Sequence, residues 1–139
     1  MSMFPSISIA GSGLSVDQTW IDAVGGNIAN AQDQVTPGQP VYREQSVVAV
    51  PVGGTSPLGQ PTAGNGVAVQ EIAVSNGKGV LTYNPTNPLA NKQGYIVTPN
   101  INIGHELTSL VEAQVNYEAD ATVLQNSDTA YKNVLSIKA

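Results

Sequence analysis

The sequence predicts a mainly α-helical protein in which the N- and C-terminal helices pair as an antiparallel coiled coil, with a small β-rich insert between them. Apolar residues repeat every seven positions near both ends of the chain. The segment between them holds most of the prolines and glycines and divides into short β-type runs. At 139 residues the chain has the length of one ordinary domain. We therefore expect 1–31 and 103–139 to form a helical core domain and 32–102 to form the insert.

The first heptad pattern runs through residues 6–31. One position of the repeat holds apolar residues, namely Ile7, Leu14, Ile21 and Ile28. The position three residues later holds Ala10, Asp17, Val24 and Ala31. Glycine recurs four times in the same stretch, and each glycine costs a helix about 1 kcal/mol relative to alanine. The pattern therefore predicts a helix that needs a packing partner.

The insert has the composition of short strands joined by turns. Runs of β-forming residues at 47–52, 67–74, 80–83 and 95–98 predict four strands. Residues 53–66 are rich in glycine and proline, which predicts a long mobile loop between the first two strands. Large apolar side chains are few here. We therefore expect a small β subdomain or an extended arm.

The second heptad pattern runs through residues 103–138. Its first stripe consists of Ile103, Leu110, Tyr117, Leu124 and Tyr131, and its adjoining stripe of Leu107, Gln114, Ala121, Asp128 and Leu135. Asn102 is the expected N-cap. A helix of this length measures roughly 50 Å, whereas a compact domain of this size is about 30 Å across. The helix is therefore expected to overhang, and its outer faces to pack against neighbouring copies.

Composition excludes several classes of function. The chain has no cysteine, which rules out disulfides, thiolate zinc sites and cysteine nucleophiles. Its five basic residues are far apart and its net charge is −5, so no nucleic-acid partner is expected. The first base is Arg43, so a cleaved secretory signal with a basic n-region is not expected. A membrane span is not expected either, because no apolar run reaches 18 residues.

Candidate catalytic residues are sparse. The single histidine, His105, has no second histidine to form a metal site, and we interpret it as a polar residue in an exposed first helical turn. Two acid pairs do not share one helix face and are interpreted as solvated, Asp17 with Asp22 and Glu118 with Asp120. Residues 11–13 read Gly-Ser-Gly but lack the strand and base of a phosphate-binding loop; close helix approach explains them equally well. We expect no enzyme activity, cofactor or metal.

Three stretches resemble the axial rod and hook proteins of the bacterial flagellum. Ser12-Gly13-Leu14, followed by Asn27-Ile28-Ala29-Asn30-Ala31, is similar to the N-terminal helix signature of that family, in which the two asparagines end the helix. The segments 83–101 and 106–119 resemble the proximal rod protein of the basal body, the second ending in Val115-Asn116-Tyr117-Glu118-Ala119. The resemblance extends over nearly the whole chain.

This resemblance implies a flagellar D0-type helix pair in a structural subunit of the basal-body rod. Such a subunit polymerises helically, serves motility by transmitting torque from rotor to hook, and is exported by the flagellar type III apparatus without a cleaved signal peptide. The rod crosses the periplasm in bacteria with two membranes. Expected partners are copies of itself, other proximal rod proteins, a rotor-side adaptor and the export apparatus, with no small-molecule substrate. Charged residues make up only 11% of the chain, which suits tightly packed seams between subunits.

The expected assembly seam follows the heptad stripes and the two asparagines of the signature. It consists of Ile7, Leu14, Ile21, Ile28, Asn27, Asn30, Leu110, Tyr117, Leu124 and Tyr131. The alternative function is a secreted helical filament component or adhesin of another type III-like system. That class shares long helices and low charge but does not require the segment 83–101.

Overall fold

The computed structural model describes residues 4–53 and 64–137. Its elements are α1 (Phe4–Asn30), β1 (Gln45–Pro51), β2 (Val67–Val74), β3 (Val80–Tyr83), β4 (Tyr95–Thr98) and α2 (Ile103–Ile137). The prediction of a mainly helical protein with a small β-rich part is confirmed. Ten residues of the predicted mobile loop, 54–63, lie outside the described residues.

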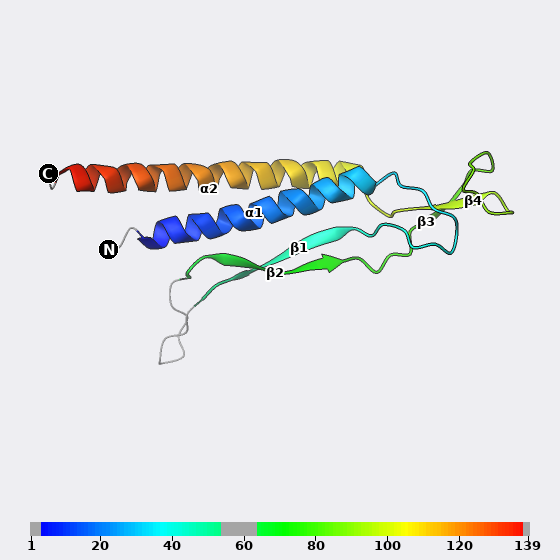
Figure 1. The fold of residues 1–139 in the computed structure, drawn as a ribbon, viewed down its shortest axis with the longest axis horizontal. Coiled ribbons are helices and arrows are strands. Elements are labelled where there is room, and N and C mark those ends of the chain that lie inside the picture. The colour runs from blue at the N-terminus through cyan, green and yellow to red at the C-terminus, as the bar shows by residue number, and fades with distance from the viewer. Residues whose placement is uncertain (1–3, 54–63, 138–139) are drawn as a thin grey trace.

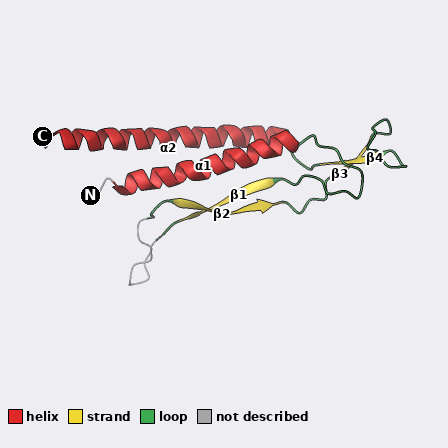
Figure 2. Ribbon diagram, in the orientation of Figure 1, coloured by secondary structure: helices red, strands yellow, loops and turns green. Residues whose placement is uncertain are grey.

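The molecule is elongated and built in layers (Figure 1). The two helices run antiparallel side by side, and the β1–β2 hairpin lies along the opposite side of α1. The smaller β3–β4 sheet lies beyond the end of the helix pair at which α1 ends and α2 begins (Figure 2). As a result α1 is covered from two sides, while α2 packs against the rest of the chain from one side only.

Two contacts set the register of the helix pair. Gly13 lies against Asp120, and Asn27 is hydrogen-bonded to Glu106, which places the two contacts 14 residues apart along each helix (13 to 27, 106 to 120). Trp20 and Ala113 are midway between them. Because α2 has 35 residues and α1 has 27, about 12 Å of α2 extends past the start of α1 (Figure 1).

Of the two heptad stripes predicted for α1, one is more deeply buried than the other. Ala10, Asp17, Val24 and Ala31 are buried, whereas the stripe of larger apolar residues that begins at Ile7 is half-buried. The adjoining stripe predicted for α2 does not form the interface with α1, because Leu107, Gln114, Asp128 and Leu135 are exposed in the single subunit and Ala121 is half-buried. The covered positions follow the first stripe by three residues, at Glu106, Ala113, Asp120 and Ser127. Ala113 and Ser127 have small side chains, and Asp120 is accommodated because Gly13 has none, which permits the close approach of α1.

Both sheets are antiparallel hairpins. In the first, Gln45 pairs with Val74 and Pro51 with Val67, with a bulge between Val48 and Ala49. In the second, Val80 pairs with Thr98 and Tyr83 with Tyr95, and the two tyrosine rings meet edge to face at 5.2 Å. Val35 exchanges two backbone hydrogen bonds with Val97, so the segment after α1 is tied to β4. Ile96 and Val97 are the buried core of this end.

Candidate assembly site

A buried polar junction joins α1, α2 and β1. Its centre is the side chain of Asn27, which is 1% exposed. Asn27 Nδ2 donates to the carbonyl oxygen of Gln45 at 2.8 Å and to Glu106 Oε2 at 2.9 Å. Asn27 Oδ1 accepts from the backbone N–H of Gln45 at 2.9 Å and from the Tyr42 hydroxyl at 3.2 Å. Every donor and acceptor site of the amide is therefore used.

Glu106 supplies the carboxylate of this junction from the first turn of α2 and is 4% exposed. The positive end of the helix dipole stabilises a carboxylate at this position. Asn102 caps the same turn by accepting the backbone N–H of His105 at 3.2 Å, which confirms the predicted N-cap. Burial, and secondarily the charge of Glu106, raise the pKa of the Tyr42 phenol, so Tyr42 remains a neutral donor.

The Ser12-Gly13 part of the signature marks a second meeting point, where α1 contacts both β2 and α2. Ser12 Oγ donates to the carbonyl oxygen of Ile9 at 2.7 Å and accepts the backbone N–H of Val67 at 3.0 Å. A Cβ atom on Gly13 would overlap the carboxylate of Asp120. Close approach therefore explains Gly13. It does not explain the glycines at 11 and 25, which have open space beside them.

The predicted seam residues are brought to three different environments. Asn27 is enclosed in the junction, and Asn30 ends α1 by donating from Nδ2 to the carbonyl oxygen of Gly26 at 2.8 Å. Six apolar seam residues are half-buried: Ile7, Leu14, Ile21, Ile28, Leu110 and Leu124. Tyr117 and Tyr131 are exposed. Sequence reasoning missed Tyr42 and assigned Glu106 no role in this junction; the acid in the first turn of α2 was the available signal.

The outer face of α2 carries an uncovered apolar surface. Its members are Leu107, Val111 and Val115, which are between 50% and 58% exposed. They are spaced four residues apart and so share one side of the helix. Exposed apolar surface of this extent is typical of a protein interaction site. Over the described residues, neither helix is long and apolar enough to cross a membrane.

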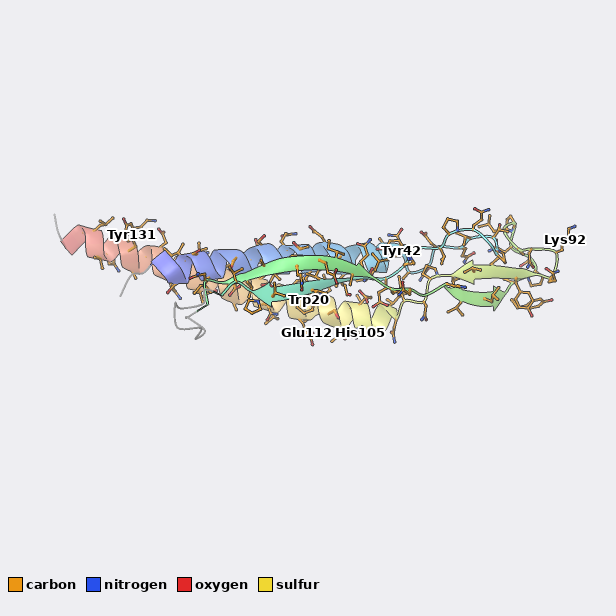
Figure 3. All side chains as sticks on the ribbon, turned by 90° about the horizontal axis from the view of Figure 1, so that it is seen from below. Trp20, Tyr42, Lys92, His105, Glu112 and Tyr131 are labelled. Atoms are coloured by element: carbon orange, nitrogen blue, oxygen red, sulfur yellow. The ribbon has the colours of Figure 1, made fainter. Side chains whose placement is uncertain are left out.

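His105 and the acidic side chains outside the junction are potential metal ligands in the part of the chain that the structure describes. His105 is exposed and lies with Glu112 at the outer edge of α2 (Figure 3). Within 4–53 and 64–137, no three potential metal-ligating side chains form a group. A groove of about 720 Å³ beside the loops at 38–43 and 76–78 is lined by Arg43 and Lys78, and its lining holds no acid or histidine.

A long antiparallel helix pair with an uncovered apolar face is the architecture of an assembly subunit, and comparison with known proteins defines its class. A family model described as the C-terminal region of the flagellar basal body rod FlgEFG proteins matches residues 92–137. This match spans β4 and α2. Relatives that match nearly the whole chain give the same class, the flagellar basal-body rod proteins, which are structural.

The particular family is given by relatives that match the whole chain. The flagellar basal-body rod protein FlgC of Agrobacterium fabrum is 35% identical, covering 94% of this chain and 92% of the relative. The FlgC proteins of Borreliella burgdorferi and Bacillus subtilis are each 30% identical, covering 99% of this chain and 98% and 99% of the relatives. The chain belongs to the FlgC family. It is a structural subunit of the flagellar basal-body rod, and the alternative of another secreted filament is not supported.

Proposed function

We propose that this subunit polymerises helically through its terminal helices and transmits torque from the rotor to the hook. The observation that carries the proposal is the uncovered apolar face of α2 described above. Packing of neighbouring copies or other rod proteins against this face would remove it from water, at roughly 25 cal/mol for each Å² of apolar surface. Half-buried seam residues such as Ile7 and Leu124 would be covered further when copies pack together.

Torque transmission requires that force on one element reaches the others. The junction at Asn27 joins the end of α1, the start of α2 and the start of β1 through four hydrogen bonds. The Ser12–Val67 hydrogen bond ties the other end of the β1–β2 hairpin to α1. The helices and the hairpin are therefore fixed to each other at both ends, which suits a load-bearing subunit.

We further propose that the chain is exported by the flagellar type III apparatus without a cleaved signal peptide. In bacteria with two membranes the assembled rod then crosses the periplasm. Its neighbours there are other proximal rod proteins and an adaptor on the rotor side. The composition of α1 supports export in an unfolded state, because four glycines in one helix make it dependent on packing partners. We also propose that the chain is organised in two domains. Residues 1–31 and 103–139 form a terminal-helix domain, and residues 32–102 form the insert.

The uncovered face is tested by placing a charge on it. Val115→Asp, in a strain that lacks the chromosomal gene, is expected to abolish swimming and to leave basal bodies without a complete rod. The control is Gln114→Asp, which adds the same charge at the neighbouring exposed position outside the apolar set. Electron microscopy of purified basal bodies reads out assembly, and circular dichroism shows whether both variants fold. Normal rods with Val115→Asp would contradict the proposal.

His105 is expected to be dispensable. Its side chain is exposed, and the hydrogen bond to Asn102 comes from the backbone N–H, which any residue except proline supplies. His105→Gln should therefore leave the diameter of swimming rings in soft agar within experimental error of the wild type. Loss of swimming with intact filaments would show a role for the imidazole that the exposed position does not indicate.

A further inference from the structure

Two aspartates lie near each other at the interface between α1 and α2, where both line one small cavity. Asp17 belongs to the buried stripe of α1 and is only 7% exposed. Asp120 reaches it from α2, and its carboxylate occupies the space left by the missing side chain of Gly13. An acid at a heptad seam position is unusual, because such positions favour apolar residues.

The surroundings of this pair offer no compensating positive charge. A small cavity of about 260 Å³ beside it is lined by Gly13, Val16, Asp17, Val67, Asn116, Ala119 and Asp120. On the hairpin side, Asp17 is flanked by Val16, Trp20, Val47 and Ala49. Neither set contains a base. Among the described residues no hydrogen bond reaches the carboxylate of Asp17.

The other acids nearby point elsewhere. Asp22, the next acid on α1, is exposed and accepts a hydrogen bond from Gln18 Nε2 at 2.9 Å. On α2, Glu112 and Glu118 are exposed, and on β2 the exposed Glu71 pairs with Val48. Asp120 is therefore the charged group that faces Asp17. Burial and, secondarily, the charge of Asp120 raise the pKa of Asp17 above its ordinary value.

We propose that Asp17 and Asp120 form a proton-responsive contact that weakens the helix pair when Asp17 is ionised beside the Asp120 carboxylate and tightens it when Asp17 binds a proton. A protonated carboxyl group can donate a hydrogen bond to a neighbouring carboxylate, whereas two ionised carboxylates repel. If the rod assembles as proposed above, the consequence is a helix pair held below its full stability in the free subunit at neutral pH. Such a subunit is less prone to associate before it reaches the growing rod.

The direction of the pH dependence follows from linkage. The pKa of Asp17 is raised on folding, so the folded chain binds the proton more tightly than the unfolded chain. The contribution of this group to stability is therefore most favourable below the pKa of an unfolded aspartate, about 3.9. It becomes less favourable as pH rises through the raised pKa of the folded state.

The test compares Asp17→Asn with Asp22→Asn in the full-length purified chain, using thermal unfolding followed by circular dichroism between pH 4 and pH 8. Asn keeps the shape of the side chain and removes its charge. We expect Asp17→Asn to raise Tm by about 4 °C at pH 7, with a gain that shrinks toward pH 4. Asp22→Asn, on the same helix but exposed, should change Tm little and equally at each pH.

A second pair of variants tests the partner. Asp120→Asn should also raise Tm at pH 7, and combining it with Asp17→Asn should give less than the sum of the two gains, because either change removes the repulsion. A lower Tm or lower helix content for Asp17→Asn at pH 7, or a gain independent of pH, would overturn the proposal. These measurements use the unassembled chain. Their result therefore does not depend on the rod-assembly test with Val115→Asp, and the failure of one proposal can be distinguished from the failure of the other.

Discussion

Replacing Asn27 with alanine is expected to lower the free energy of unfolding by about 3–5 kcal/mol. The change deletes four hydrogen bonds at a side chain that is 1% exposed. More costly than the lost bonds are the groups left behind, since the Glu106 carboxylate and the backbone N–H of Gln45 lose this partner in a buried place. Equilibrium unfolding in urea measures the effect.

The matched control is Asn30→Ala, three residues later on the same helix. Asn30 is half-buried and its side chain donates a hydrogen bond to the carbonyl oxygen of Gly26, so we expect a loss of about 1 kcal/mol. Asn27→Asp should be at least as damaging as Asn27→Ala, because it has the same shape but sets a second carboxylate against Glu106. Equal losses for Asn27→Ala and Asn30→Ala would show that the junction does not hold the three elements together.

Ala113→Asp is expected to cost a comparable amount, at least about 3 kcal/mol. Ala113 is 0% exposed and lies midway along α2 between the two contacts that set the helix register. An ionised carboxylate there has no positive partner among the described residues and adds to the negative charge of Asp17 and Asp120. The larger side chain also has no space at this close approach of the helices.

Two further variants show how the loss of stability depends on where the aspartate is placed along α2. Gln114→Asp places the same charge one residue away on the exposed surface and should change stability by less than about 0.5 kcal/mol. Leu124→Asp, at a half-buried position near the start of α1, should fall between the two. Urea unfolding with an unchanged m-value checks this order. If Leu124→Asp proved more damaging than Ala113→Asp, the centre of the helix interface would lie elsewhere.

The helices and strands were largely predictable because their signals are local. A period of seven residues at both ends predicted helices at 6–31 and 103–138, and the structure has them at Phe4–Asn30 and Ile103–Ile137. Four β-type runs became four strands with nearly the same bounds. The largest shift is β1, which starts at Gln45 rather than at 47, where Asn27 binds the backbone of Gln45. That contact spans 18 residues, and no local pattern contains it.

The face of α2 was not predictable in full. A heptad allows the second stripe to follow the first by three or by four residues, and the larger apolar residues Leu107 and Leu135 favoured four. In the structure the covered stripe follows the first by three residues, so Glu106 and Ala113 are covered. Leu107 and Leu135 remain exposed. Apolar side chains are therefore distributed between the inside of one subunit and its outer face, and hydrophobicity alone does not distinguish the two.

The sequence by itself determined the class of fold, the helix and strand positions and, through motifs that resemble the flagellar axial proteins, the family. These depend on periodicity and on short stretches of residues. Only the tertiary structure decided that Asn27 meets Glu106, 79 residues away, that Gly13 makes room for Asp120, and that two acids share the helix interface. The physical reason is that a residue's partner is set by the register and close approach of whole elements, which depend on the packing of the entire chain.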